Sequence, residues 1–169
     1  MNSKLLPVYV TGNVNKAKHF GKMLGRDIEH FAVDVEEIQS LDVREVVAHK
    51  ARAAYEKVKR PVIVEDTTLV FTALGALPGP LIKWFLEELK PEGLCSLLDF
   101  KDRTAIIGSA IAYYDGEQME IFNTEKRGTI AVSPRGTNGW GFDSGFILDG
   151  HSKTNAELSD EEYEQMYKR

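Results

Sequence analysis

The stretch LLPVYVTGNVNKAKHFGKMLG, residues 5–25, changes its hydrophobic pattern halfway along. Residues 5–11 form a short apolar run of strand-favouring side chains, and this run stops at Gly12. Residues 15–24 then place apolar side chains at helical spacing until Gly25. A short apolar run bounded by turn residues indicates a buried strand, and the spacing that follows indicates a helix. The stretch therefore predicts a strand that turns sharply on glycine into a helix.

The same two patterns alternate along the rest of the chain. The expected helices cover residues 43–58, closed by Pro61, then 81–89 and 93–100, separated by Pro91, and a last helix from Ser159. The expected strands cover residues 28–35, 61–64, 104–114, 118–122 and 128–132, with an apolar stretch at 69–74 and a hairpin turn at Asp115-Gly116. This alternation predicts a mixed α/β fold with a central β-sheet flanked by helices, and it leaves the order of the strands open.

Length and composition restrict the class of protein. The 169 residues suit one domain, residues 1–169, and 43% hydrophobic with 28% charged residues is a globular composition. A net charge of −5 argues against nucleic acid or an anionic membrane as partner. Cys95 is the single cysteine, which excludes an internal disulfide. No apolar run approaches the ~20 residues that span a bilayer, and the start is not leader-like. We expect a soluble, cytoplasmic protein.

The first candidate site is the predicted turn Thr11-Gly12-Asn13 with Lys16 one helical turn later. A strand that turns on glycine into a helix leaves unpaired backbone N–H groups pointing outward, where the helix dipole attracts phosphate. Lys16 would neutralise phosphate charge. The glycine spacing matches neither a Walker loop nor a dinucleotide fingerprint, so a simple turn with a helix cap explains the same residues.

The second candidate site consists of carboxylates. Glu65 and Asp66 directly follow the apolar residues 61–64 of a predicted strand, and Glu36 and Glu37 lie earlier in the chain. Carboxylate oxygens suit Mg²⁺, which shares its coordination shell with water and substrate phosphates. A solvated surface pair is the simpler interpretation of Glu36-Glu37, whereas a carboxylate at the end of a buried strand lies where α/β sheets bind ligands.

Two lysines and one glycine-rich loop complete the candidates. Lys50 and Lys83 lie in predicted helices and are most simply surface charges, unless they converge on a cleft for a polyanionic substrate. Residues 136–143 place three glycines around Trp140 and Phe142, which predicts a loop. Its aromatic rings would stack on a base with Asp143 accepting hydrogen bonds, or would anchor the turn in the core.

Taken in order, these motifs resemble those of the inosine triphosphate pyrophosphatase family, the Ham1-like pyrophosphatases of non-canonical purine nucleoside triphosphates. The resemblance covers nearly the whole chain. The matching stretches are TGN with Lys16 (11–16), VEDT (64–67), ALGALPGPLIKWF (73–85), PRG through GFD (134–143) and TNAEL (154–158). The stretch at 73–85 is the most specific of these.

The resemblance implies an α/β fold of two lobes around a cleft, a homodimer, and Mg²⁺-dependent hydrolysis of a nucleoside triphosphate to monophosphate and pyrophosphate. It implies that Asp66 activates water and that the metal ligands are Glu37, Asp66 and Glu65. The implied substrate-binding residues are Thr11, Gly12, Asn13, Lys16, Lys50, Thr67 and Lys83 for the phosphates, and Trp140, Gly141, Phe142, Asp143, Lys168 and Arg169 for the base.

The chain departs from the family pattern at a few positions. His19 stands where the family has an acid, and Tyr163 and Tyr167 stand where it has lysine and serine. Lys168 replaces a histidine and would still donate a hydrogen bond to a purine oxygen, while Arg169 matches. These changes leave two alternatives open, the same reaction on a different or modified base, and a nucleotide-binding protein that has lost catalysis.

Overall fold

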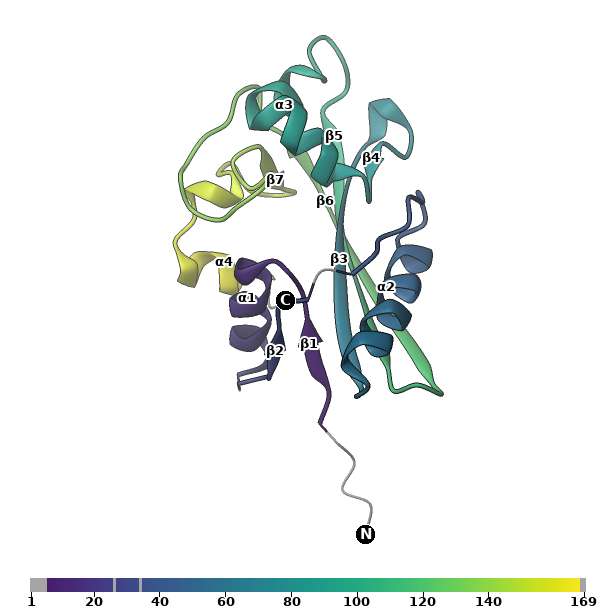
Figure 1. The fold of residues 1–169 in the computed structure, drawn as a ribbon. Coiled ribbons are helices and arrows are strands. Elements are labelled where there is room, and N and C mark those ends of the chain that lie inside the picture. The colour runs from purple at the N-terminus through teal and green to yellow at the C-terminus, as the bar shows by residue number, and fades with distance from the viewer. Residues whose placement is uncertain (1–5, 26, 34, 168–169) are drawn as a thin grey trace. The chain divides into compact units, whose positions relative to one another are not determined.

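The computed structural model describes residues 6–25, 27–33 and 35–167 and has the predicted mixed α/β fold (Figure 1). Its helices are α1 (Val14–Leu24), α2 (Val43–Val58), α3 (Ile82–Ser96) and α4 (Asp160–Tyr167), with 3-10 turns at Thr72–Leu74 and Asn155–Glu157. Its strands are β1 (Val8–Val10), β2 (His30–Phe31), β3 (Val62–Phe71), β4 (Pro78–Gly79), β5 (Thr104–Tyr114), β6 (Met119–Ile130) and β7 (Phe146–Leu148).

The strands form one mixed sheet in the order β2-β1-β3-β5-β6-β7, with β4 paired to β3. β1 runs parallel to both β2 and β3, and Tyr9 lies opposite His30 and Ile63. β4 pairs antiparallel with β3, and β7 with the end of β6. The chain divides into two compact units, the first made of residues 1–67 and 109–124 and the second of 68–108 and 125–169.

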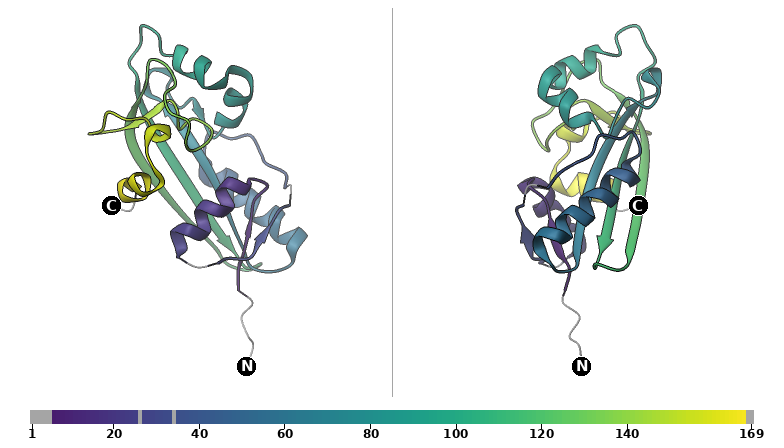
Figure 2. Two further views of the ribbon diagram at one scale, coloured as in Figure 1. Left: turned by 90° about the vertical axis from the view of Figure 1, so that its left-hand side faces the viewer. Right: turned by 45° about the vertical axis from the view of Figure 1, so that its right-hand side comes forward.

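The first unit packs α1 and α2 on opposite faces of its strands (Figure 1). Val10 belongs to the apolar core under α2, together with buried residues of that helix. Tyr9, the preceding residue in β1, points to the other face and stacks on Phe20 of α1, with ring centroids 4.3 Å apart. This follows from the alternation of side chains along a strand. Figure 2 shows α2 lying along the strands of this unit.

The second unit has a core of its own. Leu69 and Phe71 of β3 pack with Leu94, Cys95 and Phe146 in one buried cluster. The hydrogen bonds of the long loop between β6 and β7, residues 131–145, join it to the segment 154–158. The predicted base-binding residues of the described chain therefore lie in this unit.

The strand predicted at 61–64 is longer than expected. β3 continues from Val62 to Phe71 without a break, so Glu65 and Asp66 lie in the middle of a strand and not at its end. Both acids have polar partners in the folded protein, and these partners allow two charged residues inside the strand. The predicted strand at 128–132 is likewise the end of β6.

The helix predictions hold with small corrections at the ends. α1 ends at Gly25 in the left-handed conformation, as predicted, and α2 covers the predicted residues. α2 ends at Lys59 with a positive φ, two residues before Pro61. α3 breaks at Lys90, because a residue that precedes proline avoids the helical conformation. No helix in the described part of the chain is long and apolar enough to cross a bilayer.

Candidate active site

The turn between β1 and α1 is built by two of the residues predicted to bind phosphate. The backbone N–H of Asn13 donates to Thr11 Oγ1 at 3.1 Å. Asn13 Oδ1 in turn accepts from the backbone N–H groups of Asn15 and Lys16 at 2.9 and 3.3 Å, so Asn13 is the N-cap of α1. The prediction that the first N–H groups of this helix are unpaired is therefore wrong for these two residues.

Gly12 leaves open space beside this turn. A Cβ at this position would meet no atom within 4 Å, whereas the neighbouring Thr11 is buried. The backbone at Gly12 is thus accessible to a substrate group.

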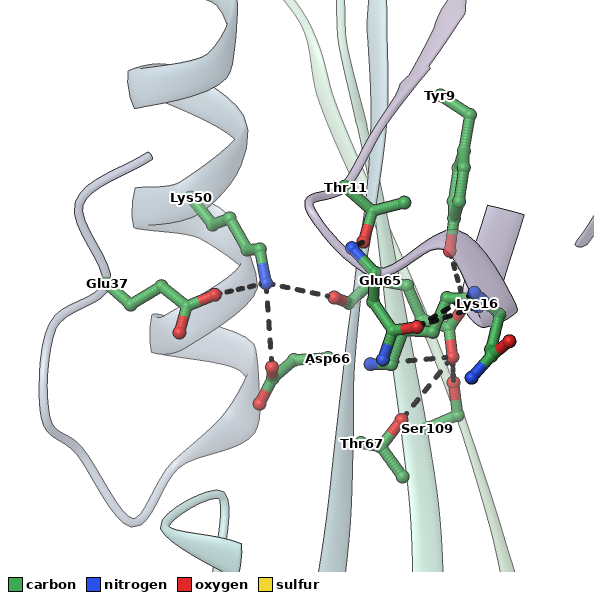
Figure 3. A network of polar contacts seen from close by, with 11 residues as sticks. Tyr9, Thr11, Lys16, Glu37, Lys50, Glu65, Asp66, Thr67 and Ser109 are labelled. Atoms are coloured by element: carbon green, nitrogen blue, oxygen red, sulfur yellow. Dashed lines mark hydrogen bonds and ion pairs between the residues drawn. The ribbon is translucent and has the colours of Figure 1, made fainter. Parts of the chain in front are cut away.

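The two acids of β3 point to opposite faces of the sheet. Asp66 shares its face with Val62 and Val64, which pack in the core under α2. Glu65 shares its face with Tyr9 of the neighbouring strand, whose hydroxyl donates to Glu65 Oε2 at 2.7 Å. Figure 3 shows the separate contacts of the two carboxylates. Adjacent acids in a strand therefore take separate roles.

Lys50 joins Asp66 to a second carboxylate. It lies on the buried stripe of α2 and is only 7% exposed, so the simpler prediction of a surface charge is wrong. Its Nζ lies 2.5 Å from Glu37 Oε1 and 3.7 Å from Asp66 Oδ1, and it donates to the carbonyl oxygen of Glu65 at 3.3 Å. Glu37 is itself exposed, with a side chain 42% accessible, so it remains a solvated acid while it also contacts the buried Lys50 (Figure 3).

Burial raises the pKa of Asp66 above the ordinary carboxyl range. The charges of Lys16 and Lys50 oppose this rise, and those of Glu37 and Glu65 add to it. A carboxylate with a raised pKa is a stronger base than one in water. Asp66 is thus suited to accept a proton while two cations hold negative charge nearby.

The donor chemistry of this cluster suits Mg²⁺. Within residues 6–25, 27–33 and 35–167, no group of three or more His, Cys, Asp and Glu residues is placed to hold a metal. Mg²⁺ requires no such group, because it commonly binds through one or two carboxylates and completes its shell with water and phosphate oxygens. Glu37 and Asp66, which approach the same ammonium, are the carboxylates available for this role.

Glu65 is engaged in a network on the other face of β3. Besides the hydroxyl of Tyr9, it accepts from Ser109 at 3.2 Å and Thr67 at 3.5 Å, both at Oε1. Lys16 Nζ lies 4.0 Å from the same oxygen. Burial and the charge of Glu65 raise the pKa of Tyr9, which therefore stays protonated as a donor. Lys16 therefore lies close to Glu65, and its charge also acts on Asp66.

Sequence reasoning did not identify Tyr9 and Ser109 as site residues. Each sits in an apolar strand, where a single hydroxyl is most simply a core residue or a tolerated exception. Their positions on the face of the sheet that carries Glu65 could have identified them, because residues that face each other on paired strands share a face of the sheet once the register is known. That inference requires the strand order, which the sequence left open.

Lys83 and its neighbours lie in the second unit. Lys83 is exposed at the start of α3, and its Nζ lies 5.3 Å from the centre of the Trp84 ring. The prediction of a surface charge on a helix is confirmed for this lysine.

The glycine-rich loop has the predicted irregular structure but uses its two aromatic residues differently. Phe142 packs against the core of the second unit, whereas Trp140 remains 37% exposed. Gly141 between them has a positive φ of 63°, which turns the chain and separates the two rings. Trp140 is thus the more exposed of the two rings.

Asp143 is buried within the same loop. Its Oδ2 accepts from the backbone N–H of Trp140 at 2.8 Å, and its Oδ1 accepts from Asn155 Nδ2 at 3.1 Å. The backbone of the loop also binds the following segment. The N–H groups of Thr137 and Asn138 both donate to the carbonyl of Ala156. Asp143 therefore has a structural role that the sequence did not reveal.

Two of the predicted base-binding residues, Lys168 and Arg169, lie outside the described residues. Tyr163, at the position where the resemblance predicts a lysine, is half-buried in α4.

Comparison with known proteins identifies relatives along nearly the whole chain. The model of the Ham1 family matches residues 7–169. The inosine triphosphate pyrophosphatase of Schizosaccharomyces pombe is 41% identical over 160 residues, which cover 92% of this chain and 84% of that protein. The inosine triphosphate pyrophosphatase 2 of Trypanosoma cruzi is 41% identical over 158 residues, with 90% and 81% covered.

Solved structures agree with this relationship. A nucleoside-triphosphatase / dITP/XTP pyrophosphatase from Mycobacterium abscessus superposes with a TM-score of 0.77 at 26% identity, covering 97% of this chain and 95% of that chain. A HAM1 protein from Coxiella burnetii superposes with a TM-score of 0.80 at 26% identity, covering 95% and 90%.

Proposed function

The chain belongs to the Ham1 family, and on this basis we propose that it hydrolyses non-canonical purine nucleoside triphosphates to the monophosphate and pyrophosphate. Inosine, deoxyinosine and xanthosine triphosphates are the proposed substrates, and removing them would cleanse the nucleotide pool. The observation that carries the proposal is the cluster in which Lys50 contacts both Glu37 and Asp66. The buried cation can neutralise phosphate charge, and the two carboxylates can bind a metal ion.

Asp66 is the proposed catalytic base. A water molecule attacks the α-phosphorus, Asp66 accepts its proton, and the bond from this phosphorus to the bridging oxygen breaks to release pyrophosphate. The raised pKa of Asp66 favours proton acceptance. Lys16 and Lys50 would stabilise the negative charge on the phosphates, aided by Thr11, Asn13, Thr67 and the open backbone at Gly12. Phosphoryl transfer depends mainly on such positioning and charge neutralisation.

Mg²⁺ is the proposed cofactor, and Glu37 and Asp66 are its proposed ligands. When bound, the ion would neutralise charge on the triphosphate and on the departing pyrophosphate. We give Glu65 a supporting role in place of the predicted ligand role, because its oxygens accept hydrogen bonds from Tyr9, Ser109 and Thr67.

The second unit is proposed to supply recognition of the base. Trp140 offers an exposed ring on which a purine can stack, and Gly141, Phe142 and Asp143 shape the loop around it. Lys83 is proposed as a further phosphate ligand, and Lys168 and Arg169 as donors to the purine.

The proposal is tested with purified protein, Mg²⁺ and a panel of triphosphates, scoring pyrophosphate separately from orthophosphate. We expect pyrophosphate, released fastest from inosine or xanthosine triphosphate. Pyrophosphate chiefly from another base would support the alternative substrate, which the altered residues Tyr163, Tyr167 and Lys168 suggest. Nucleotide binding without pyrophosphate from any of them would overturn the proposal and leave a binding protein.

The metal site is tested with Glu37→Gln, using Glu36→Gln as the matched control. We expect chelation by EDTA to abolish hydrolysis, and Glu37→Gln to raise the Mg²⁺ concentration for half-maximal activity by about tenfold or more. Glu36 is exposed like Glu37 but is not a proposed ligand, so its variant should match the wild type. An unchanged Mg²⁺ requirement in Glu37→Gln would exclude Glu37 as a ligand.

We further propose a homodimer in the cytoplasm, on the family resemblance alone. Light scattering on the eluted protein tests the dimer, and a mass of one chain, 19.0 kDa, would exclude it.

A further inference from the structure

The carboxylate of Asp143 closes the loop to which it belongs. Asp143 is 7% exposed, and its Oδ2 accepts from the backbone N–H of Trp140, while its own N–H donates to the Trp140 carbonyl at 3.2 Å. Gly139, which has a positive φ of 73°, allows this approach, since a Cβ there would lie 2.4 Å from Asp143 Oδ2. The conformation of Trp140 therefore depends on where the Asp143 carboxylate is held.

Asn155 holds that carboxylate from the neighbouring segment. It is 3% exposed, and its side-chain amide donates to Asp143 Oδ1 at 3.1 Å. The backbone of the next residue, Ala156, donates to the Asp143 carbonyl at 3.0 Å. A buried carboxylate is costly unless donors satisfy it, so a donor at position 155 stabilises the observed placement of Asp143.

We propose that Asn155 is a positioning residue for recognition of the base. It orients Asp143, Asp143 orients the backbone of Trp140, and Trp140 presents its exposed ring. This inference rests on the proposed function in one respect, that Trp140 receives the base. Asn155 belongs to the second unit, whereas the proposed phosphate-binding residues other than Lys83 belong to the first.

The first test compares Asn155→Ala with the wild type on inosine triphosphate. We expect KM to rise about tenfold with kcat within about twofold, because the lost hydrogen bond to a charged group supports base binding and not the chemical step. Inhibition by inorganic tripolyphosphate, which has no base, should stay unchanged. Asn123→Ala is the control, since Asn123 is exposed in the first unit and accepts from Arg44 at 3.0 Å.

A second test exchanges the two side chains. In the double variant Asp143→Asn/Asn155→Asp, the new amide can donate to the new carboxylate and accept from the backbone of Trp140. KM for inosine triphosphate is expected to rise in Asn155→Ala. We expect the exchange to bring KM most of the way back to the wild-type value. A KM for the double variant no better than that of Asn155→Ala would contradict a positioning role and indicate that the charge at position 143 is itself required.

A third measurement follows the loop without turnover. Trp84 and Trp140 are the two tryptophans, so a Trp84→Phe background reports on Trp140 alone. We expect Asn155→Ala in this background to increase quenching of Trp140 fluorescence by acrylamide. Unchanged quenching would overturn the proposed link, whether or not the double variant folds.

The outcomes separate this inference from the proposed function. A wild-type protein that releases no pyrophosphate contradicts the function, while fluorescence still tests the link between Asn155 and Trp140. An active wild type whose KM for inosine triphosphate is unchanged by Asn155→Ala contradicts the inference alone. Equal losses with inosine triphosphate and tripolyphosphate would show a general structural defect and would also overturn it.

Discussion

The carboxylate of Asp66 is buried, which disfavours its charged form, and the same residue is the proposed catalytic base. Burial is the main cause of its raised pKa, and the charges of Lys16 and Lys50 only partly compensate. The folded protein therefore binds the Asp66 proton more tightly than the unfolded chain does. This group stabilises the fold below the ordinary carboxyl pKa, and that stabilisation is lost as the pH rises through the raised pKa.

Replacing Asp66 by asparagine should separate stability from activity. We expect Asp66→Asn to abolish pyrophosphate release and to have a higher Tm than the wild type at neutral pH, because the neutral amide avoids the cost of a buried charge. The difference in Tm should vanish below about pH 4, near the ordinary pKa of a carboxyl group, where the wild-type side chain is also neutral. Asp149→Asn, at an exposed position, is the control. A lower Tm for Asp66→Asn at neutral pH would contradict this account.

Tyr9 is tested by removing one oxygen atom. Tyr9→Phe keeps the stack on Phe20 but deletes the donor to Glu65, so we expect unfolding in urea to show a loss of about 1.5–3 kcal/mol. Tyr114→Phe is the matched control, since the Tyr114 hydroxyl donates to the uncharged carbonyl of Gly116. If Tyr9→Phe lowers the free energy of unfolding no more than Tyr114→Phe does, the hydrogen bond to Glu65 stabilises the fold no more than a bond to an uncharged carbonyl.

Single residues differ in how far the sequence reveals them. Asp66 could be identified because an acid next to a buried apolar run is unusual, and family motifs indicated Lys50. The burial of Lys50 could not be predicted, because a lysine on a helix is normally exposed and only its partners Glu37 and Asp66 explain its position. Asn155 escaped notice for the same reason, since its partner Asp143 is 12 residues away.

At the scale of elements, the conformation of the glycine-rich loop depends on how closely it approaches the segment 154–158. Gly136 has a φ of 81°, and a Cβ there would lie 2.2 Å from the backbone of Ala156. Gly150 has the same φ, but a Cβ there would meet no atom within 4 Å. Substitutions at the two glycines share the backbone strain, but only the one at Gly136 also creates a close contact. Comparing them therefore separates the two effects.

Alanine at these two glycines should have unequal effects. Gly150→Ala bears only the strain of a left-handed residue, about 1–2 kcal/mol. Gly136→Ala bears the same strain and must also move the loop away from Ala156, so we expect a larger loss of stability and a higher KM for inosine triphosphate. Unfolding in urea and steady-state kinetics measure both effects. Equal losses for the two variants would contradict the proposed close contact.

Helices were easier to predict than strands. The spacing of apolar residues within 43–58 is a local property, and α2 has the predicted bounds. β3 was predicted too short because Glu65 and Asp66 interrupt its apolar pattern, while their partners come from other elements. The strand predicted at 28–35 is much shorter in the structure, where β2 has two residues, and β7 has three. Strands this short give no periodic pattern that would fix their bounds.

At the scale of the whole molecule, the sequence predicted the fold class and left the strand order open. Alternating strands and helices indicate a mixed sheet, but the order β2-β1-β3-β5-β6-β7 results from pairing between distant segments. The resemblance implied two lobes, but the residue pattern alone does not show where the two units divide, since β3, β5 and β6 each contribute to both. The phosphate candidates fall mainly in the first unit and the base candidates in the second.

Hydrolysis of inosine triphosphate in ¹⁸O-labelled water tests the proposed chemistry most directly. With Mg²⁺ present, we predict inosine monophosphate and pyrophosphate in equal amounts, with the ¹⁸O in the monophosphate, because water attacks the α-phosphorus. Label in the pyrophosphate, or the release of orthophosphate and inosine diphosphate, would contradict the assignment of the cluster around Asp66 to this reaction.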